Sequence, residues 1–278
     1  MKNFNSDFFA LFGCLLTSIG IELSLIGAIA KAKDSEWADL QITFAYDDSI
    51  CPVRKRIAPL DGENCIPESL MPFSEELIVD AETMGIRHVV MYLDPKNPGI
   101  SPDDTHPELR MPPSEPAVLD AKGCVFEPHV FFSRVGQKLK LQNSDEYGHN
   151  PNIVFFANYP ESRMHPPGHA VEMEFSISEK APSPIHCNIH PWMRAYVLVF
   201  DHPYVGISDR QGRLTIEKLP AGKPINFKVW HESMEKSIDQ VTFRGEPTHW
   251  TKGNVQLTLL AGMNDLGIVK IKPDKFKK

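Results

Sequence analysis

A cysteine, a histidine and a methionine lie within seven residues of one another in the segment Cys187-Asn-Ile-His190-Pro-Trp-Met193. A further histidine, His149, stands upstream after a short polar stretch. Two imidazoles, one thiolate and a weak axial thioether are the donors of a trigonal blue-copper site that transfers electrons. The pattern therefore predicts one type 1 copper ion per chain, with His149, Cys187 and His190 in the ligand plane and Met193 as axial ligand.

Two other kinds of site use the same residue types. Cys-x2-His is also half of a zinc site, but the candidates for the second half, His165 and His169, have no partner cysteine near them. A cysteine hydrolase would use Cys187 as nucleophile and His149 as base, yet no nucleophile elbow and no helix start precedes Cys187. Copper fits the residues best.

The axial position stays open, because two more methionines are available. Met164 and Met173 both lie between the first histidine and the ligand loop. Either thioether could take the place that we assign to Met193.

These donors need a rigid frame that brings two distant segments together. Residues 117–200 contain short stretches in which apolar and polar residues alternate, separated by turn signals, which predicts an antiparallel β-sandwich. The expected strands are residues 117–119, 125–132, 138–142, 153–156, 170–176 and 194–200. His149 and the Cys187 loop then lie at strand ends, so that a metal ion joins the two sheets at one end of the sandwich.

The segment from about Cys124 to Tyr204 resembles the cupredoxins, and its short ligand loop is similar to that of amicyanin. The matching pieces are residues 124–129, 135–137, 143–145, 149–150, 187–193 and 201–204. The resemblance extends to bacterial cupredoxins of the methylamine-utilisation-associated and planctomycete type. It implies a Greek-key β-sandwich, a copper cofactor and a redox protein as partner. It also implies an electron carrier that transforms no substrate, so we do not expect an enzyme.

The resemblance also assigns roles around the ligands. Asn150 would hydrogen-bond across to the Cys187 loop and hold the two ligand segments in register. His190 would be the electron port, and Pro191 and Trp192 beside it would form an apolar docking patch for the partner. His129 matches a family position but precedes the ligand strand, so we expect it near the site and not as a ligand.

Residues 1–32 have the pattern of a signal peptide. Lys2 is followed by a long apolar stretch that ends in small-x-small sequences typical of a cleavage site. The alternative is a retained membrane anchor, although Glu22 would be costly inside a membrane. We expect cleavage, no membrane span in the mature protein, and a periplasmic or secreted location.

Export changes how the cysteines are interpreted, because an oxidising compartment favours disulfides. With Cys187 on the metal, Cys51, Cys65 and Cys124 remain after the leader is removed. Cys51 and Cys65 are close enough in sequence to close a small loop. The family resemblance implies instead a Cys65–Cys124 disulfide, which leaves Cys51 free.

The rest of the chain predicts a second small β-sandwich. Strands are expected at residues 37–46, 76–80, 87–94, 255–260 and 267–271, and residues 208–232 resemble the turns and strands of carboxypeptidase regulatory-like (transthyretin-like) modules. The predicted organisation is all-β. It comprises N-terminal strands in residues 37–97, a proline-rich linker in 98–116, the cupredoxin domain in 117–201 and the regulatory-like module in 202–273. Residues 37–97 and 202–273 would share one discontinuous sandwich.

Composition limits the choice of function. The formal net charge is −7 at pH 7, and a chain without basic clusters is not expected to bind nucleic acid. Two alternatives to an electron carrier remain. One is a periplasmic copper-binding or delivery protein, and the other is a surface-interaction protein in which copper is structural.

Overall fold

The computed structural model describes residues 36–57, 65, 71–234 and 238–277. The predicted all-β fold class is confirmed, because within these residues the chain forms strands in four sheets, and its helical segments are 3-10 turns of three residues. The leader predicted in residues 1–32 lies outside the described residues. In the part that the structure describes, no helix has the length and apolar character needed to cross a membrane.

Two sheets contain the strands of residues 117–200, in the orders β4-β3-β6-β9 and β5-β11-β10-β7-β8. The strands are β3 (Ala117–Lys122), β4 (Val125–Glu127), β5 (Val130–Arg134), β6 (Lys138–Asn143), β7 (Pro151–Ile153), β8 (Glu161–Ser162), β9 (Ala170–Glu174), β10 (Ser183–Cys187) and β11 (Arg194–Phe200). Alternate residues of β6 are buried, as expected for a strand with one face on a core. The apolar residues of both sheets form one buried cluster, so these strands make a sandwich.

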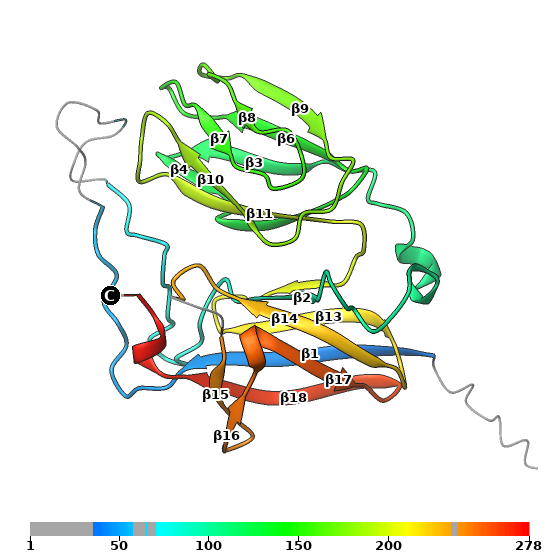
Figure 1. Cartoon of the computed structure of the whole chain (residues 1–278). Coiled ribbons are helices and arrows are strands. Elements are labelled where there is room, and N and C mark those ends of the chain that lie inside the picture. The colour runs from blue at the N-terminus through cyan, green and yellow to red at the C-terminus, as the bar shows by residue number, and fades with distance from the viewer. Residues whose placement is uncertain (1–35, 58–64, 66–70, 235–237, 278) are drawn as a thin grey trace, which may run out of the picture. The chain divides into compact units, whose positions relative to one another are not determined.

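Two further sheets combine strands from both ends of the described chain, in the orders β13-β1-β18-β15-β16 and β12-β2-β14-β17. The strands are β1 (Trp37–Tyr46), β2 (Val90–Leu93), β12 (Val205–Ile207), β13 (Arg213–Pro220), β14 (Pro224–Trp230), β15 (Gln240–Phe243), β16 (Glu246–His249), β17 (Asn254–Thr258) and β18 (Gly262–Ile271). The first strand, β1, pairs in parallel with the last, β18, and the two run side by side in Figure 1. A second buried cluster fills the space between these sheets.

A third apolar cluster connects the two sandwiches, and aromatic rings dominate it. It joins β2 to β5 and β11. Tyr92 stacks on Phe200 with ring centroids 5.0 Å apart, and Tyr196 packs edge-on against Trp230 at 4.9 Å. Aromatic pairs of this kind add about 0.5–1.5 kcal/mol beyond the area that they bury. They therefore help to hold the sandwich of residues 117–200 against the other sandwich.

Several strand predictions need correction. Residues 76–80 form only an isolated bridge between Val79 and Ile86, because the Asp80 carboxylate accepts the Glu82 and Thr83 amides and stabilises a turn. The strand expected at 87–94 begins only at Val90, since His88 has a φ of 67°, outside the β region.

Two further predicted segments are interrupted. The strand expected at 125–132 is divided into β4 and β5, because Pro128 has no amide hydrogen for the ladder. The segment expected as a linker, residues 98–116, contains the 3-10 turns η2 (Pro102–Asp104) and η3 (Pro107–Leu109).

Candidate metal centre

The loop after β10 brings three of the predicted donors together. β10 ends at Cys187, and the chain turns tightly, because the Cys187 amide donates to the Met193 carbonyl at 3.1 Å and the Met193 amide donates to His190 at 2.9 Å. β7 runs antiparallel to β10, with Pro151 opposite Cys187. His149, two residues before Pro151, is thereby placed beside the loop.

Three of the four predicted donors converge. The Nδ1 atoms of His149 and His190 lie 3.0 Å apart, and the Cys187 sulfur lies 3.8 Å from His190 Nδ1. All three side chains are at most 5% exposed. Met193 is fully buried and belongs to the same apolar cluster as Cys187. Two ring nitrogens that face one another beside a free buried thiol form a donor set that suits a soft or borderline metal ion.

Cys65 also lies at this site, which the sequence did not indicate. Among the described residues, the metal-binding atoms of Cys65, His149 and His190 all lie within 4.8 Å of one another, and Cys187 is not part of that group. Cys65 is bonded to Cys124 in a disulfide with Cα atoms 6.1 Å apart, so its sulfur is not a thiolate. Cys187 is the buried free cysteine at the site, and Cys51, also free, is half-buried.

The carboxylate of Asp145 orients the ring of His149. Its Oδ2 atom accepts a hydrogen bond from His149 Nε2 at 2.9 Å, and its two oxygens also accept the amides of Gly123 and Cys124. Burial lowers the pKa of His149, and Asp145 opposes this shift. A proton held on Nε2 by Asp145 leaves the Nδ1 lone pair, which faces His190, able to bind a metal ion.

Asn150 connects the two ligand segments by hydrogen bonds. Its amide donates to the Cys187 sulfur at 3.4 Å, and its carbonyl accepts the Asn188 amide at 3.0 Å. The Asn188 side chain also donates to Asn150 Oδ1 at 3.2 Å. These hydrogen bonds hold the segment around Asn150 in register with the loop that follows Cys187.

The predicted docking patch is only partly accessible. Pro191 is exposed, whereas His190 is 5% exposed and covered by Trp192, whose ring centroid lies 5.2 Å away. Trp192 Nε1 donates to the carbonyl of Cys124 at 3.2 Å. The surface next to His190 therefore consists of Pro191 and the half-buried indole of Trp192.

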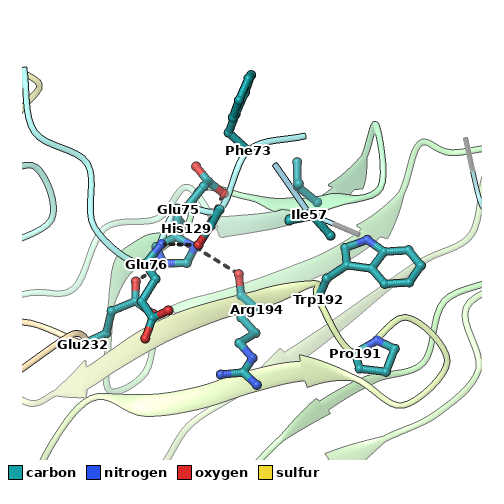
Figure 2. A pocket seen from close by; sticks show the side chains of 11 residues that line it. Ile57, Phe73, Glu75, Glu76, His129, Pro191, Trp192, Arg194 and Glu232 are labelled. Atoms are coloured by element: carbon teal, nitrogen blue, oxygen red, sulfur yellow. Dashed lines mark hydrogen bonds and ion pairs between the residues drawn. The ribbon is translucent and has the colours of Figure 1, made fainter. Parts of the chain in front are cut away.

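A cavity of about 230 Å³ adjoins this patch. Figure 2 shows Trp192 and Pro191 on one side and His129 with three glutamates, Glu75, Glu76 and Glu232, on the other. His129 therefore lines the same cavity as Pro191 and Trp192, and its expected structural or near-site role stays a prediction.

His129 is held in a buried polar network that the sequence did not reveal. His129 Nε2 hydrogen-bonds Glu232, and Nδ1 faces the Arg194 carbonyl at 3.0 Å. Burial alone would lower the pKa of His129, but the hydrogen bond and charge of Glu232 outweigh it and raise that pKa. The two residues lie 103 positions apart in the sequence, so no local pattern indicates that they meet.

Comparison with known proteins gives partial structural similarity. No family model and no curated protein matches the chain. The Cu-containing nitrite reductase from Thermus scotoductus SA-01 is similar at 20% identity and a TM-score of 0.28 over 31% of this chain. A purple cupredoxin from Nitrosopumilus maritimus is similar at 19% identity and a TM-score of 0.26 over 30% of this chain. A reduced amicyanin variant is similar at 19% identity and a TM-score of 0.28 over 39% of this chain. The matches span 22% of the reductase chain, 98% of the purple cupredoxin and 97% of the amicyanin.

Proposed function

We propose that this chain is an exported type 1 copper protein that carries electrons between redox partners. One observation carries the proposal, which is the convergence of His149, His190 and Cys187 in a buried, mostly apolar pocket. The three side chains come from two segments that β7 and β10 hold in register. Such a preformed site changes its geometry little between oxidation states, which suits electron transfer.

In this proposal each residue has a defined role. His149, His190 and Cys187 would hold the ion, and the buried thioether of Met193 would be the fourth donor. Copper would supply the one-electron couple between Cu(II) and Cu(I). Asp145 fixes the His149 ring through its Nε2 hydrogen bond, and the apolar core around Cys187 excludes water.

Electrons would leave on the side of Trp192 and Pro191, because Pro191 is exposed and Trp192 contacts His190. A small apolar patch with a polar rim fits a transient redox partner. The glutamates beside the patch, Glu75 and Glu76, would favour a partner with basic residues around its own docking surface. We propose a periplasmic or secreted location, which the disulfide supports.

The test is the visible and electron paramagnetic resonance (EPR) spectrum of the copper-loaded protein. A type 1 site gives an intense blue band from thiolate-to-copper charge transfer and a small copper hyperfine splitting in the EPR spectrum. A colourless protein with an ordinary, widely split Cu(II) spectrum would contradict the proposal.

Copper delivery is a second candidate, and Cys65 is the observation that favours it. The Cys65 sulfur lies within 4.8 Å of both imidazoles, so reduction of its disulfide would add a competing thiolate to the site. A delivery protein would release copper to an acceptor chelator once the disulfide is reduced. An electron carrier would keep its copper through repeated oxidation and reduction.

A further inference from the structure

His165 lies directly opposite His149 in an isolated antiparallel bridge. The His165 amide donates to the His149 carbonyl at 2.7 Å, and the His149 amide donates to the His165 carbonyl at 3.1 Å. Residues opposite one another in such a pair project from the same face. The His165 side chain, only 2% exposed, therefore lies on the same side as the proposed ligand His149.

One ring nitrogen of His165 has no hydrogen bond within the part of the chain that the structure describes. Its Nε2 atom is buried and has no hydrogen-bond partner among the described residues. A buried polar atom that is left unpaired destabilises the folded state. An unpaired imidazole nitrogen in this position is a vacant metal donor.

The imidazole of His169 lies at a distance from His165 that allows both rings to bind one metal ion. The ring centroids of His165 and His169 are 5.3 Å apart, and the rings are nearly perpendicular. The proposed ligands His149 and His190 have a similar centroid distance, 4.8 Å. Nitrogen–metal bonds of about 2.0–2.1 Å would hold two such rings at roughly this distance. His169 is exposed, so the pair reaches from the surface to a buried nitrogen.

We propose that His165 and His169 form a second, surface-connected copper site that passes the ion to the ligands at His149. Imidazole pairs bind several divalent ions, and Cu(II) binds most strongly in the first-row series. The nearby carboxylate of Glu161 is already paired with Arg163, at 2.5 and 2.8 Å. Among the described residues, neither histidine belongs to a larger group of metal-binding side chains. A site with two protein donors holds its ion loosely and releases it readily.

Transfer from this site is a ligand exchange. The ion moves from His165 to the adjacent His149 without a change in oxidation state, and the Cys187 thiol loses its proton to solvent as it binds. This transfer rests on the proposed function, because it needs copper ligands at His149 and Cys187. The second site itself does not depend on them.

The experiment titrates the full-length metal-free chain with Cu(II) and records EPR spectra. We expect a type 1 signal and a second, widely split signal with nitrogen hyperfine structure. His169→Ala should lose the second signal and keep the first, and its blue colour should develop more slowly to the same final intensity. His169 is exposed, so this substitution leaves the core intact. His249→Ala, at an exposed histidine on β16, is the matched control and should keep both signals.

A second signal that persists unchanged in His169→Ala, or is absent from the wild-type protein, would overturn the proposal. A Cys187→Ala background separates it from the proposed function. There the type 1 signal should disappear while the second signal still depends on His169. If the wild-type protein shows only the second signal, lost in His169→Ala, the type 1 assignment fails and the second site stands.

Discussion

The Nδ1 atoms of His149 and His190 face each other at 3.0 Å, although 41 residues separate them in the sequence. The register of β7 against β10 produces this approach, since it sets Pro151 opposite Cys187. Asp145 binds the far side of one ring, and Trp192 covers the other. The pair is therefore fixed before any metal arrives, which is the preorganisation that a fast electron carrier requires.

The first prediction concerns Cys187. Cys187→Ser replaces the thiolate whose charge transfer to copper produces the colour, so the protein should stay folded and lose its intense visible band. Absorption spectroscopy with circular dichroism measures both properties. Cys51→Ser, at the half-buried free cysteine, should remain blue. A blue Cys187→Ser protein would contradict the assignment of Cys187 as the copper ligand.

Met193 should tune the reduction potential without determining the colour. Met193→Leu removes a weak donor that helps Cu(II), so the potential should rise, whereas Met193→Gln supplies a harder oxygen and should lower it. Voltammetry measures both. Met173→Leu is the control, at a partly buried methionine that packs against the cluster in which Met193 is buried. A potential that moves only in the control would make Met173 the axial ligand.

The Asp145 carboxylate should contribute to copper affinity although it does not touch the metal. Asp145→Asn removes the charge that holds the His149 ring, and losses of this kind reduce metal affinity by about 10- to 100-fold. Competition with a chelator of known affinity measures the change. Asp120→Asn provides the control, because Asp120 bonds Ser144 and not His149. Equal affinities in the two variants would remove Asp145 from the site.

The disulfide should stabilise the fold as well as cover the metal centre. Peptide mapping without reductant should recover Cys65 joined to Cys124, and a Cys51–Cys65 peptide would contradict the structure. The bridge spans 59 residues, and closing such a loop stabilises a protein by about 4 kcal/mol in the chain-entropy model. The double variant Cys65→Ala/Cys124→Ala should lose much of that stability in denaturant titrations.

The His129–Glu232 pair should make stability depend on pH. The pKa of His129 is raised in the folded protein, so above its unfolded value of about 6.5 the native state holds a proton that the unfolded state has released. Stability should fall as pH rises from there, by at most about 1.4 kcal/mol per pH unit, and level off above the folded pKa.

Glu232→Gln isolates this effect. Glu232 raises the pKa of His129 more than Glu75 does, so the decline above pH 6.5 should become clearly smaller without the Glu232 carboxylate. Denaturant titrations at several pH values compare this variant with the wild-type protein, and Glu82→Gln, at an exposed position, is the control. The same decline in all three proteins would assign it to another group.

Local patterns in the sequence were sufficient for some elements. The strand predicted at 194–200 matches β11 at both ends, because this apolar run is uninterrupted by glycine or proline. The Cys187–Met193 loop was recognisable because its donors are neighbours in sequence. The strand predicted at 76–80 was wrong, since the Asp80 side chain bonds nearby amides and favours a turn over a ladder.

The contacts that the sequence could not indicate are long-range. The Cys65 sulfur lies within 4.8 Å of nitrogens of His149 and His190, and Glu232 meets His129 across 103 residues. No periodicity or motif encodes such encounters, because they depend on how finished sheets pack. The burial of Met193 in the same apolar cluster as Cys187 likewise depends on this packing.

The parallel pairing of β1 with β18 affects the order in which the sheets can form while the chain is synthesised. β1 leaves the ribosome first among the described strands, but its neighbour β18 leaves last. Until then β1 offers an open edge, which is prone to pair with other chains. Strands β3 to β11, which frame the candidate metal centre, are complete well before β18 is synthesised and pair only with one another. The sandwich that holds the candidate metal centre is therefore complete before β18 closes the sandwich of the terminal strands.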